Sequence, residues 1–166
     1  MVTIRATSAV DVAEIRVLFE EYAQSLGIDL GFQDFENELA SLPGVYSPPS
    51  GCLLLAANNM RSVGCIGVRQ LDTYVCEMKR LYVRPDARGH GLGRRLAAAA
   101  IAFGQTAGYH AMRLDTLSTM AAARELYRQL GFRDVAPYRY NPIPETAFME
   151  LIFNDPPNQR MEPTRP

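Results

Sequence analysis

The sequence predicts an α/β fold in which helices cover a central sheet. Short apolar segments bounded by turn residues indicate strands, and apolar residues at helical spacing indicate helices between them. A glycine-rich turn joins a strand directly to a long helix in the middle of the chain. The expected order is strand, two helices, three strands, helix, strand, helix and strand, with room for another strand after Phe132.

In the first half, Val2 and Ile4 alternate with polar residues and predict a short opening strand. Ser8, followed by Asp11 three residues later, resembles a capping box and predicts the start of a helix that Gly27 ends. A second, weaker helix and a hairpin follow. The expected ranges are 32–39 for that helix, 52–57 and 62–69 for the hairpin strands, and 75–83 for the next strand.

The second half alternates helices and strands. A helix after the glycine-rich turn has Leu96, Ala100 and Phe103 on its apolar face and is closed by Gly108. The other expected elements are strands at 111–116 and 148–153 and a helix at 121–130. Residues 156–166 are polar and rich in proline, so we expect a poorly ordered tail after a single domain that spans 1–155.

Length and composition fit one globular domain. The chain has 166 residues, of which 48% are hydrophobic and 21% charged, and it can bury a proper core. No apolar run reaches the roughly 18 residues needed to cross a bilayer, so no membrane partner is expected. Three scattered cysteines and two distant histidines predict neither a disulfide framework nor a metal site, and reduced thiols fit a cytoplasmic protein.

The distribution of charge is more informative than its total. A net charge of −1 argues against nucleic acid as a partner, yet residues 79–95 alone carry +5. The basic residues of this stretch are Lys79, Arg80, Arg84, Arg88, Arg94 and Arg95, against the single acid Asp86. A local basic stretch in an otherwise acidic chain predicts a small polyanion bound at one place. Arg84 and Arg95 also fit the plainer interpretation of solvated surface arginines.

The turn Arg88-Gly89-His90-Gly91-Leu92-Gly93 has the features of an anion site. Its glycines allow positive φ angles and close approach of the backbone to a ligand. The first N–H groups of the following helix have no partners within the helix, and Arg88 and Arg94 add charge. The turn lacks the ending of a Walker A loop and the third glycine of a Rossmann fingerprint. Taken alone, it is equally compatible with a plain helix-initiating turn.

The same turn resembles the Arg/Gln-x-x-Gly-x-Gly/Ala signature of the GNAT superfamily of acyl-CoA-dependent N-acetyltransferases. IRATSAVDVAEI is similar to the opening strand and first helix of that family, and CEMKRLYVRPDARGHGLGRRL to its coenzyme-binding core. The fifth strand of the family is similar to MRLDT, and the helix that carries the family's tyrosine is similar to AAARELYRQLGF. The closing strand is similar to FMELIF. The resemblance implies a three-layer α/β fold with a mixed, mostly antiparallel sheet. Its parallel strands, at 75–83 and 111–116, would splay apart.

The resemblance also implies acetyl-CoA as the co-substrate. Its pyrophosphate would lie on backbone N–H groups of the turn and its pantetheine arm beside the strand at 75–83, where the N–H of Leu81 would stabilise the oxyanion. The residues assigned to the coenzyme are Leu81, Tyr82, Val83, Arg88, Gly89, His90, Gly91, Leu92, Gly93, Arg94 and Ser118. Ser118 stands where many members carry an asparagine, and it or Thr119 also fits a helix cap.

Two side chains are candidates for catalysis of direct acetyl transfer to a neutral amine. Tyr127 matches the family tyrosine that protonates the departing thiolate, and its ordinary pKa of ~10 keeps it protonated at neutral pH. Glu77 is the candidate general base, and strand alternation places it on one face with Lys79, Leu81 and Val83. By periodicity alone Tyr127 is a core aromatic. Glu77 equally fits an exposed carboxylate paired with Lys79 or Arg80, and many members use a water relay instead of a glutamate.

The acceptor is not specified by the sequence. The first two helices and two loops would supply Glu20, Glu21, Tyr22, Asp29, Phe32, Tyr46, Tyr138 and Tyr140. Acids and tyrosines suit a cationic amine, although each residue singly fits a solvated or packing role. A small amine, an amino acid, a peptide N-terminus and a protein lysine all stay open as acceptors. The alternative function is a catalytically silent acyl-CoA sensor, and a splayed sheet with an exposed edge is compatible with a homodimer.

Overall fold

The computed structural model describes residues 1–59 and 61–153. Its centre is a seven-stranded sheet with the strand order β1-β2-β3-β4-β5-β7-β6. Neighbouring strands are antiparallel except for β4 and β5, which are parallel. The strands are β1 (Thr3–Ala6), β2 (Cys52–Ala57), β3 (Ser62–Gln70), β4 (Val75–Val83), β5 (Ala111–Thr116), β6 (Arg133–Val135) and β7 (Ala147–Ile152). The tail expected at 156–166 lies outside the described residues.

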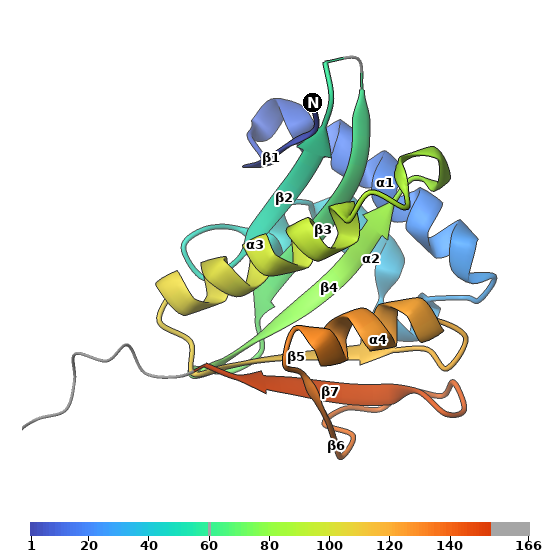
Figure 1. Ribbon diagram of the computed structural model, residues 1–166, viewed down its shortest axis with the longest axis vertical. Coiled ribbons are helices and arrows are strands. Elements are labelled where there is room, and N and C mark those ends of the chain that lie inside the picture. Colours follow the sequence, from blue (N-terminus) through green and yellow to red (C-terminus); the bar gives the residue numbers. More distant parts are fainter. Residues whose placement is uncertain (60, 154–166) are drawn as a thin grey trace, which may run out of the picture.

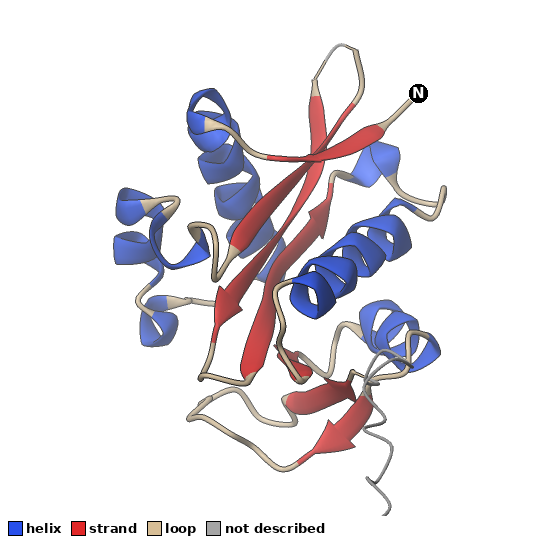
Figure 2. Cartoon of the chain, turned by 90° about the vertical axis from the view of Figure 1, so that its left-hand side faces the viewer, coloured by secondary structure: helices blue, strands red, loops and turns tan. Residues whose placement is uncertain are grey.

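Helices cover both faces of this sheet. They are α1 (Val12–Leu26), α2 (Phe35–Ser41), α3 (Leu92–Thr106) and α4 (Ala121–Gln129). In Figure 1, α3 and α4 lie in front of the strands and α1 and α2 behind them, and Figure 2 shows the sheet between the two groups. The expected three-layer α/β fold with a mixed sheet is therefore confirmed. None of the helices within 1–59 and 61–153 is long and apolar enough to cross a membrane.

The two layers of helices explain why β2 is apolar along its whole length. Leu54 and Ala56 belong to a core cluster on the α3 side, whereas Leu53 and Leu55 belong to a second cluster with residues of α1. A strand that is covered on both faces has no side on which polar residues are favoured. The continuous run at 52–57 therefore forms a central strand.

Strand β4 contains a β-bulge. Its register with β3 shifts between Cys65 and Gly67, so that Arg80 and Leu81 together oppose Ile66. Arg80 has a φ of 60°, which is uncommon for a residue other than glycine. The Arg80 side chain is held by contacts with α1 and α2, and these contacts stabilise the unusual backbone.

The bulge corrects the alternation expected for β4. Simple alternation placed Glu77 and Lys79 on the same face as Leu81 and Val83. In the structure, Leu81 and Val83 pack against the core on the α3 side. Lys79 and Arg80 instead both reach partners between α1 and the end of α2. The extra residue reverses the alternation of side chains beyond Arg80. Glu77 and Lys79 therefore lie on one face of β4, and Leu81 and Val83 lie on the other.

Candidate active site

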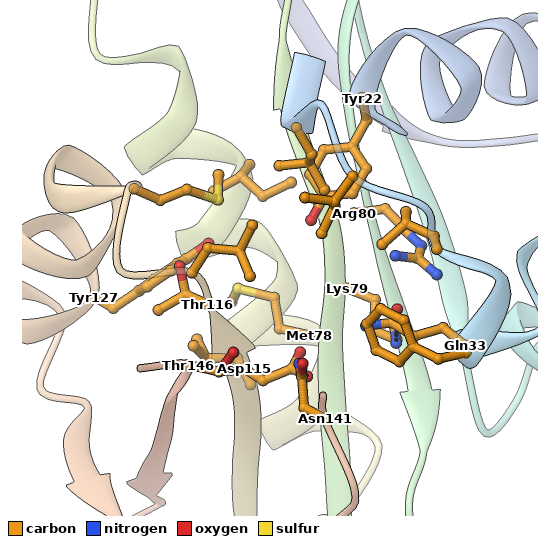
Figure 3. A pocket seen from close by; sticks show the side chains of 18 residues that line it. Tyr22, Gln33, Met78, Lys79, Arg80, Asp115, Thr116, Tyr127, Asn141 and Thr146 are labelled. Carbon is orange, nitrogen blue, oxygen red and sulfur yellow. Dashed lines mark hydrogen bonds between the residues drawn. The ribbon is translucent and has the colours of Figure 1, made fainter. Parts of the chain in front are cut away.

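A cleft opens where β4 and β5 separate. The two strands pair over only three residues each, which begin at Val75 in β4 and Ala111 in β5. Beyond this point no strand of the described residues pairs with the edge of β4 that faces β5. The cleft is lined by both strands, by α4 and by the segments that follow α1 and precede β7, and it holds about 610 Å³ of space including its open mouth (Figure 3).

The glycine-rich turn leads into the N-terminus of α3. Gly89 and Gly91 have φ values of 83° and 70°, which favour glycine over other residues. The amide of Arg95 donates the first helical hydrogen bond to the Gly91 carbonyl, at 3.1 Å. The amides of Leu92, Gly93 and Arg94 therefore have no carbonyl partner within the helix and are available to an anion. A Cβ at Gly89 or Gly91 would meet nothing within 4 Å, so the turn is open to a ligand.

The side chains of the turn are partly engaged within the protein. Arg88 Nε donates to the Val83 carbonyl at 2.8 Å, and its guanidinium lies 5.9 Å from the centre of the Tyr82 ring. The amide of Arg88 donates to the Pro85 carbonyl at 3.3 Å, so it is less free than the expected pyrophosphate contact requires. His90 Nδ1 lies 2.9 Å from the Arg88 carbonyl. The remaining arginine, Arg94, hydrogen-bonds Gln129 in α4.

Arg84 does not fit the interpretation of a solvated surface arginine. Its side chain is 15% exposed and forms an ion pair with Glu21 of α1 at 2.7 Å. Its Nη1 also donates to the Ser62 carbonyl at 2.6 Å. Arg95 is exposed as expected, although it donates to the Val2 carbonyl. Arg84 therefore joins α1 to the sheet, and only part of the basic stretch is available to a polyanion.

Tyr127 extends from α4 into the cleft (Figure 3). It is 7% exposed and makes an edge contact with Phe132, so it is also part of the core. Burial raises its pKa above the ordinary value and keeps the hydroxyl protonated. Within the described part of the chain, nothing hydrogen-bonds this hydroxyl, and the buried Oγ1 of Thr116 in the same lining also lacks a partner. Sequence reasoning did not identify Thr116, although a polar residue at the end of β5 is a usable signal.

Comparison with known families matches residues 12–132 to the Acetyltransferase (GNAT) family. The match runs from the start of α1 to Phe132 and includes β4, the glycine-rich turn, β5 and Tyr127. The chain belongs to the GNAT family. It is therefore an acyltransferase, and the resemblance noted in the sequence is confirmed.

Related GNAT proteins cover nearly the whole chain. An uncharacterized N-acetyltransferase of Schizosaccharomyces pombe is 41% identical over 143 residues, which are 85% of this chain and 88% of that protein. The IAA acetyltransferase of Azospirillum brasilense is 36% identical over 152 residues, which are 90% of this chain and 96% of that protein. The crystal structure of the PaiA N-acetyltransferase from Thermoplasma acidophilum in complex with coenzyme A has a TM-score of 0.72 at 17% identity, over 92% and 99% of the two chains.

Glu77 lies at the base of the GNAT cleft but not in its lining. Its side chain is fully buried, so the alternative interpretation is wrong about exposure, although Glu77 Oε1 does lie 3.9 Å from Lys79 Nζ. Oε1 accepts from Arg69 at 2.8 Å, and Oε2 accepts from the Tyr138 hydroxyl at 2.7 Å and pairs with Arg139. A substrate amine would have to displace one of these donors to reach the carboxylate directly.

Ser118, the candidate coenzyme contact after β5, lies outside the lining of the GNAT cleft. The residue that caps α4 is Met120, and no side chain forms a capping hydrogen bond there. The alternative interpretation of Ser118 or Thr119 as a helix cap is therefore wrong.

Few of the residues expected on the acceptor side of the GNAT fold line the cleft. Only Tyr22 and Phe32 do so. The others lie elsewhere: Glu20 on the exposed side of α1, Glu21 in the ion pair with Arg84, Asp29 in a turn with Gly31, Tyr46 in the core, Tyr138 against Glu77 and Tyr140 in solvent. The charged residues that do line the cleft are Lys79, Arg80 and Asp115. The positions of the residues outside the lining agree with the plainer interpretation, in which each has a solvated or a packing role.

Proposed function

We propose that this protein transfers the acetyl group of acetyl-CoA directly to a primary amine, with Tyr127 as the general acid. The observation that carries the proposal is the position of Tyr127, whose buried and protonated hydroxyl lies in the cleft between β4 and β5. The relatives named as N-acetyltransferases and the coenzyme A complex of PaiA support the same chemistry.

The coenzyme is assigned to the turn and to the open edge of β4. Free amides at the N-terminus of α3 suit the pyrophosphate, and the glycines at 89 and 91 leave room for it. The pantetheine arm then pairs with the β4 backbone at Leu81 and Val83, as an added strand would. Ser118 is assigned to the rim of the same site, at the end of β5.

In the reaction, the lone pair of the amine attacks the thioester carbonyl and forms a tetrahedral oxyanion, which the Leu81 amide stabilises. The carbon–sulfur bond then breaks, and Tyr127 gives its proton to the departing thiolate. The proton of the attacking amine passes to Glu77 through a water relay, because Glu77 lies outside the cleft lining. A pH–rate profile of Glu77→Gln that coincides with the wild type would eliminate this role for Glu77.

The substitution Tyr127→Phe tests the proposal. We expect kcat to fall roughly 100-fold, because the general acid is lost while the packing of the ring is kept. The Kd for acetyl-CoA should stay within about twofold, since the coenzyme contacts lie elsewhere. Thiol release from acetyl-CoA measures the first quantity and calorimetric titration the second.

The matched control is Tyr109→Phe. Tyr109 is also a buried tyrosine, but its hydroxyl donates to the Ser50 carbonyl at 2.6 Å and it does not line the cleft. We expect this variant to lose some stability and to keep its kcat. Full activity of Tyr127→Phe would remove the assignment of the general acid. Tight acetyl-CoA binding by the wild type with no thiol release for any amine would instead identify a silent acyl-CoA sensor.

A further inference from the structure

A buried lysine faces the acceptor side of the cleft, and its ammonium group donates no hydrogen bond to a carboxylate of the described residues. The Lys79 side chain is 5% exposed and lines the cleft. Its Nζ donates to Gln33 Oε1 at 3.1 Å, which uses one of the three ammonium donors. Figure 3 shows Lys79 and Gln33 on the opposite side of the view from Thr116 and Tyr127. The lysine therefore does not belong to the thiolate end of the site.

The carboxylates near Lys79 have other partners. Arg80 pairs with Glu38, and Arg69 and Arg139 pair with Glu77. Asp115 accepts from Asn141 at 3.3 Å and lies 3.8 Å from Arg139 Nε, a contact almost as long as that between Lys79 and Glu77. Glu77 Oε1 lies 3.9 Å from Lys79 Nζ, beyond hydrogen-bond distance, and already accepts from Arg69. Four cations thus share three carboxylates, and Lys79 is the cation that no described carboxylate hydrogen-bonds.

Burial makes an uncompensated ammonium costly. Desolvation, followed by the charge of Arg80, lowers the pKa of Lys79 to about 7. An anion bound beside Nζ would offset both effects, because it would supply the missing countercharge in a site with little water.

We propose that Lys79 binds a carboxylate of the acceptor, so that the acceptor is a free amino acid and not a simple amine. This inference rests on the proposed acetyltransferase function and narrows its substrate class. The carboxylate occupies the open donor positions of Lys79 on the acceptor side, while the amino group of the same molecule points to the acetyl group between β4 and β5. An acceptor without a carboxylate leaves the buried ammonium unpaired.

The test compares amino acids with their own amides, for example glycine with glycinamide and leucine with leucinamide. For the wild type we expect kcat/KM to be roughly 10- to 100-fold higher for the amino acid, since a charge-assisted hydrogen bond is lost with the amide. In Lys79→Met this preference should disappear, because the KM for the amino acid should rise much more than the KM for the amide. Lys79→Arg should restore part of the preference, because it keeps the charge.

Other outcomes overturn the inference. Equal kcat/KM for both members of each pair in the wild type would reject the carboxylate site and leave the acetyltransferase standing, as would efficient acetylation of peptides alone. An equal loss of kcat for amino acid and amide in Lys79→Met would identify Lys79 as a proton acceptor instead.

A binding measurement keeps the inference testable if no acceptor is turned over. N-acetylglycine and N-acetylglycinamide, titrated into the protein with coenzyme A present, report the carboxylate preference without catalysis. Tighter binding of the acid, lost in Lys79→Met, is the expected result. Equal binding of the two would reject the carboxylate site, whereas the absence of turnover alone would reject only the proposed activity.

Discussion

Tyr127 and Lys79 line the same cleft, and burial favours the neutral form of each side chain. It raises the pKa of Tyr127 and lowers the pKa of Lys79. For a phenol this means that the proton is retained, as a general acid requires. For an amine it means that the proton is lost more easily and that a bound anion is favoured. The same low-dielectric surroundings therefore give the two residues opposite tasks.

Lys79 should make the stability of the protein depend on pH. Its pKa falls from 10.5 in the unfolded chain to about 7 in the folded one, so between these values the unfolded chain binds more protons. The free energy of unfolding should therefore rise with pH across this window, by at most about 1.4 kcal/mol per pH unit. Below pH 7 the cost of burying the charge is fully present.

Urea unfolding of the wild type and of Lys79→Met at pH 7, 8 and 9 measures this effect. We expect the wild type to gain stability relative to the variant as the pH rises, because methionine has no proton to lose. Groups common to both proteins cancel in the difference. Parallel pH profiles would show that Lys79 keeps its ordinary pKa in the folded protein.

Among the elements, the turn before α3 and the bulge in β4 shape the site. The turn leaves amides unpaired at the helix N-terminus, and the bulge changes the face on which β4 side chains lie. Both features interrupt regular hydrogen bonding where a ligand is expected to supply the missing partner. The site proposed for the donor is thus built from incomplete secondary structure.

Gly91→Ala should weaken acetyl-CoA binding beyond its effect on folding. Gly91 has a φ of 70°, so alanine should cost about 1 kcal/mol of stability. The added methyl also lies on the surface that the pyrophosphate must approach, and we expect the Kd to rise at least roughly 10-fold. Calorimetric titration and urea unfolding measure the two effects separately.

Gly108→Ala is the matched control at the other end of α3. Gly108 has a φ of 88°, and a Cβ there would also meet nothing within 4 Å. The same backbone cost is expected without any change in Kd. Equal Kd values for the two alanine variants would show that the turn does not hold the coenzyme.

At the scale of the whole molecule, the sheet is joined across its middle by a short contact. Strands β1 to β4 and strands β5 to β7 meet through three residue pairs, supported by α3, which packs on β2, β3, β4 and β5. A ligand that lies between β4 and β5 would contact both parts. Binding to the folded state alone stabilises it by mass action.

Acetyl-CoA should therefore raise the unfolding temperature. At 100 times its Kd the expected stabilisation is about 2.7 kcal/mol. ADP is the control, because it carries the pyrophosphate without the pantetheine arm and should give a smaller shift at the same concentration. A thermal shift assay compares the two. An equal or larger shift with ADP would favour a nucleotide-binding function over an acyl-CoA site.

Much of this fold is determined by local sequence. The strands at 75–83 and 111–116 have the expected bounds, and the strand expected after Phe132 is β6. Local features suffice here, because apolar periodicity and glycines with positive φ act within a few neighbouring residues. The resemblance to GNAT proteins added Tyr127 as a candidate catalytic residue, because periodicity alone predicts only a core aromatic at this position.

Only the tertiary structure decided which charges meet. The Glu77 carboxylate accepts from Tyr138, 61 residues away, and Arg84 binds Glu21 across 63 residues. Such pairs depend on strand register, on the bulge at Arg80 and on the loop after α1, and no local pattern encodes them. The sequence by itself thus determined the family and the glycine-rich turn that is proposed to bind the donor. The position of Lys79 in the cleft lining, with no described carboxylate within hydrogen-bond distance, depends on long-range packing, because only packing assigns the nearby carboxylates to other partners.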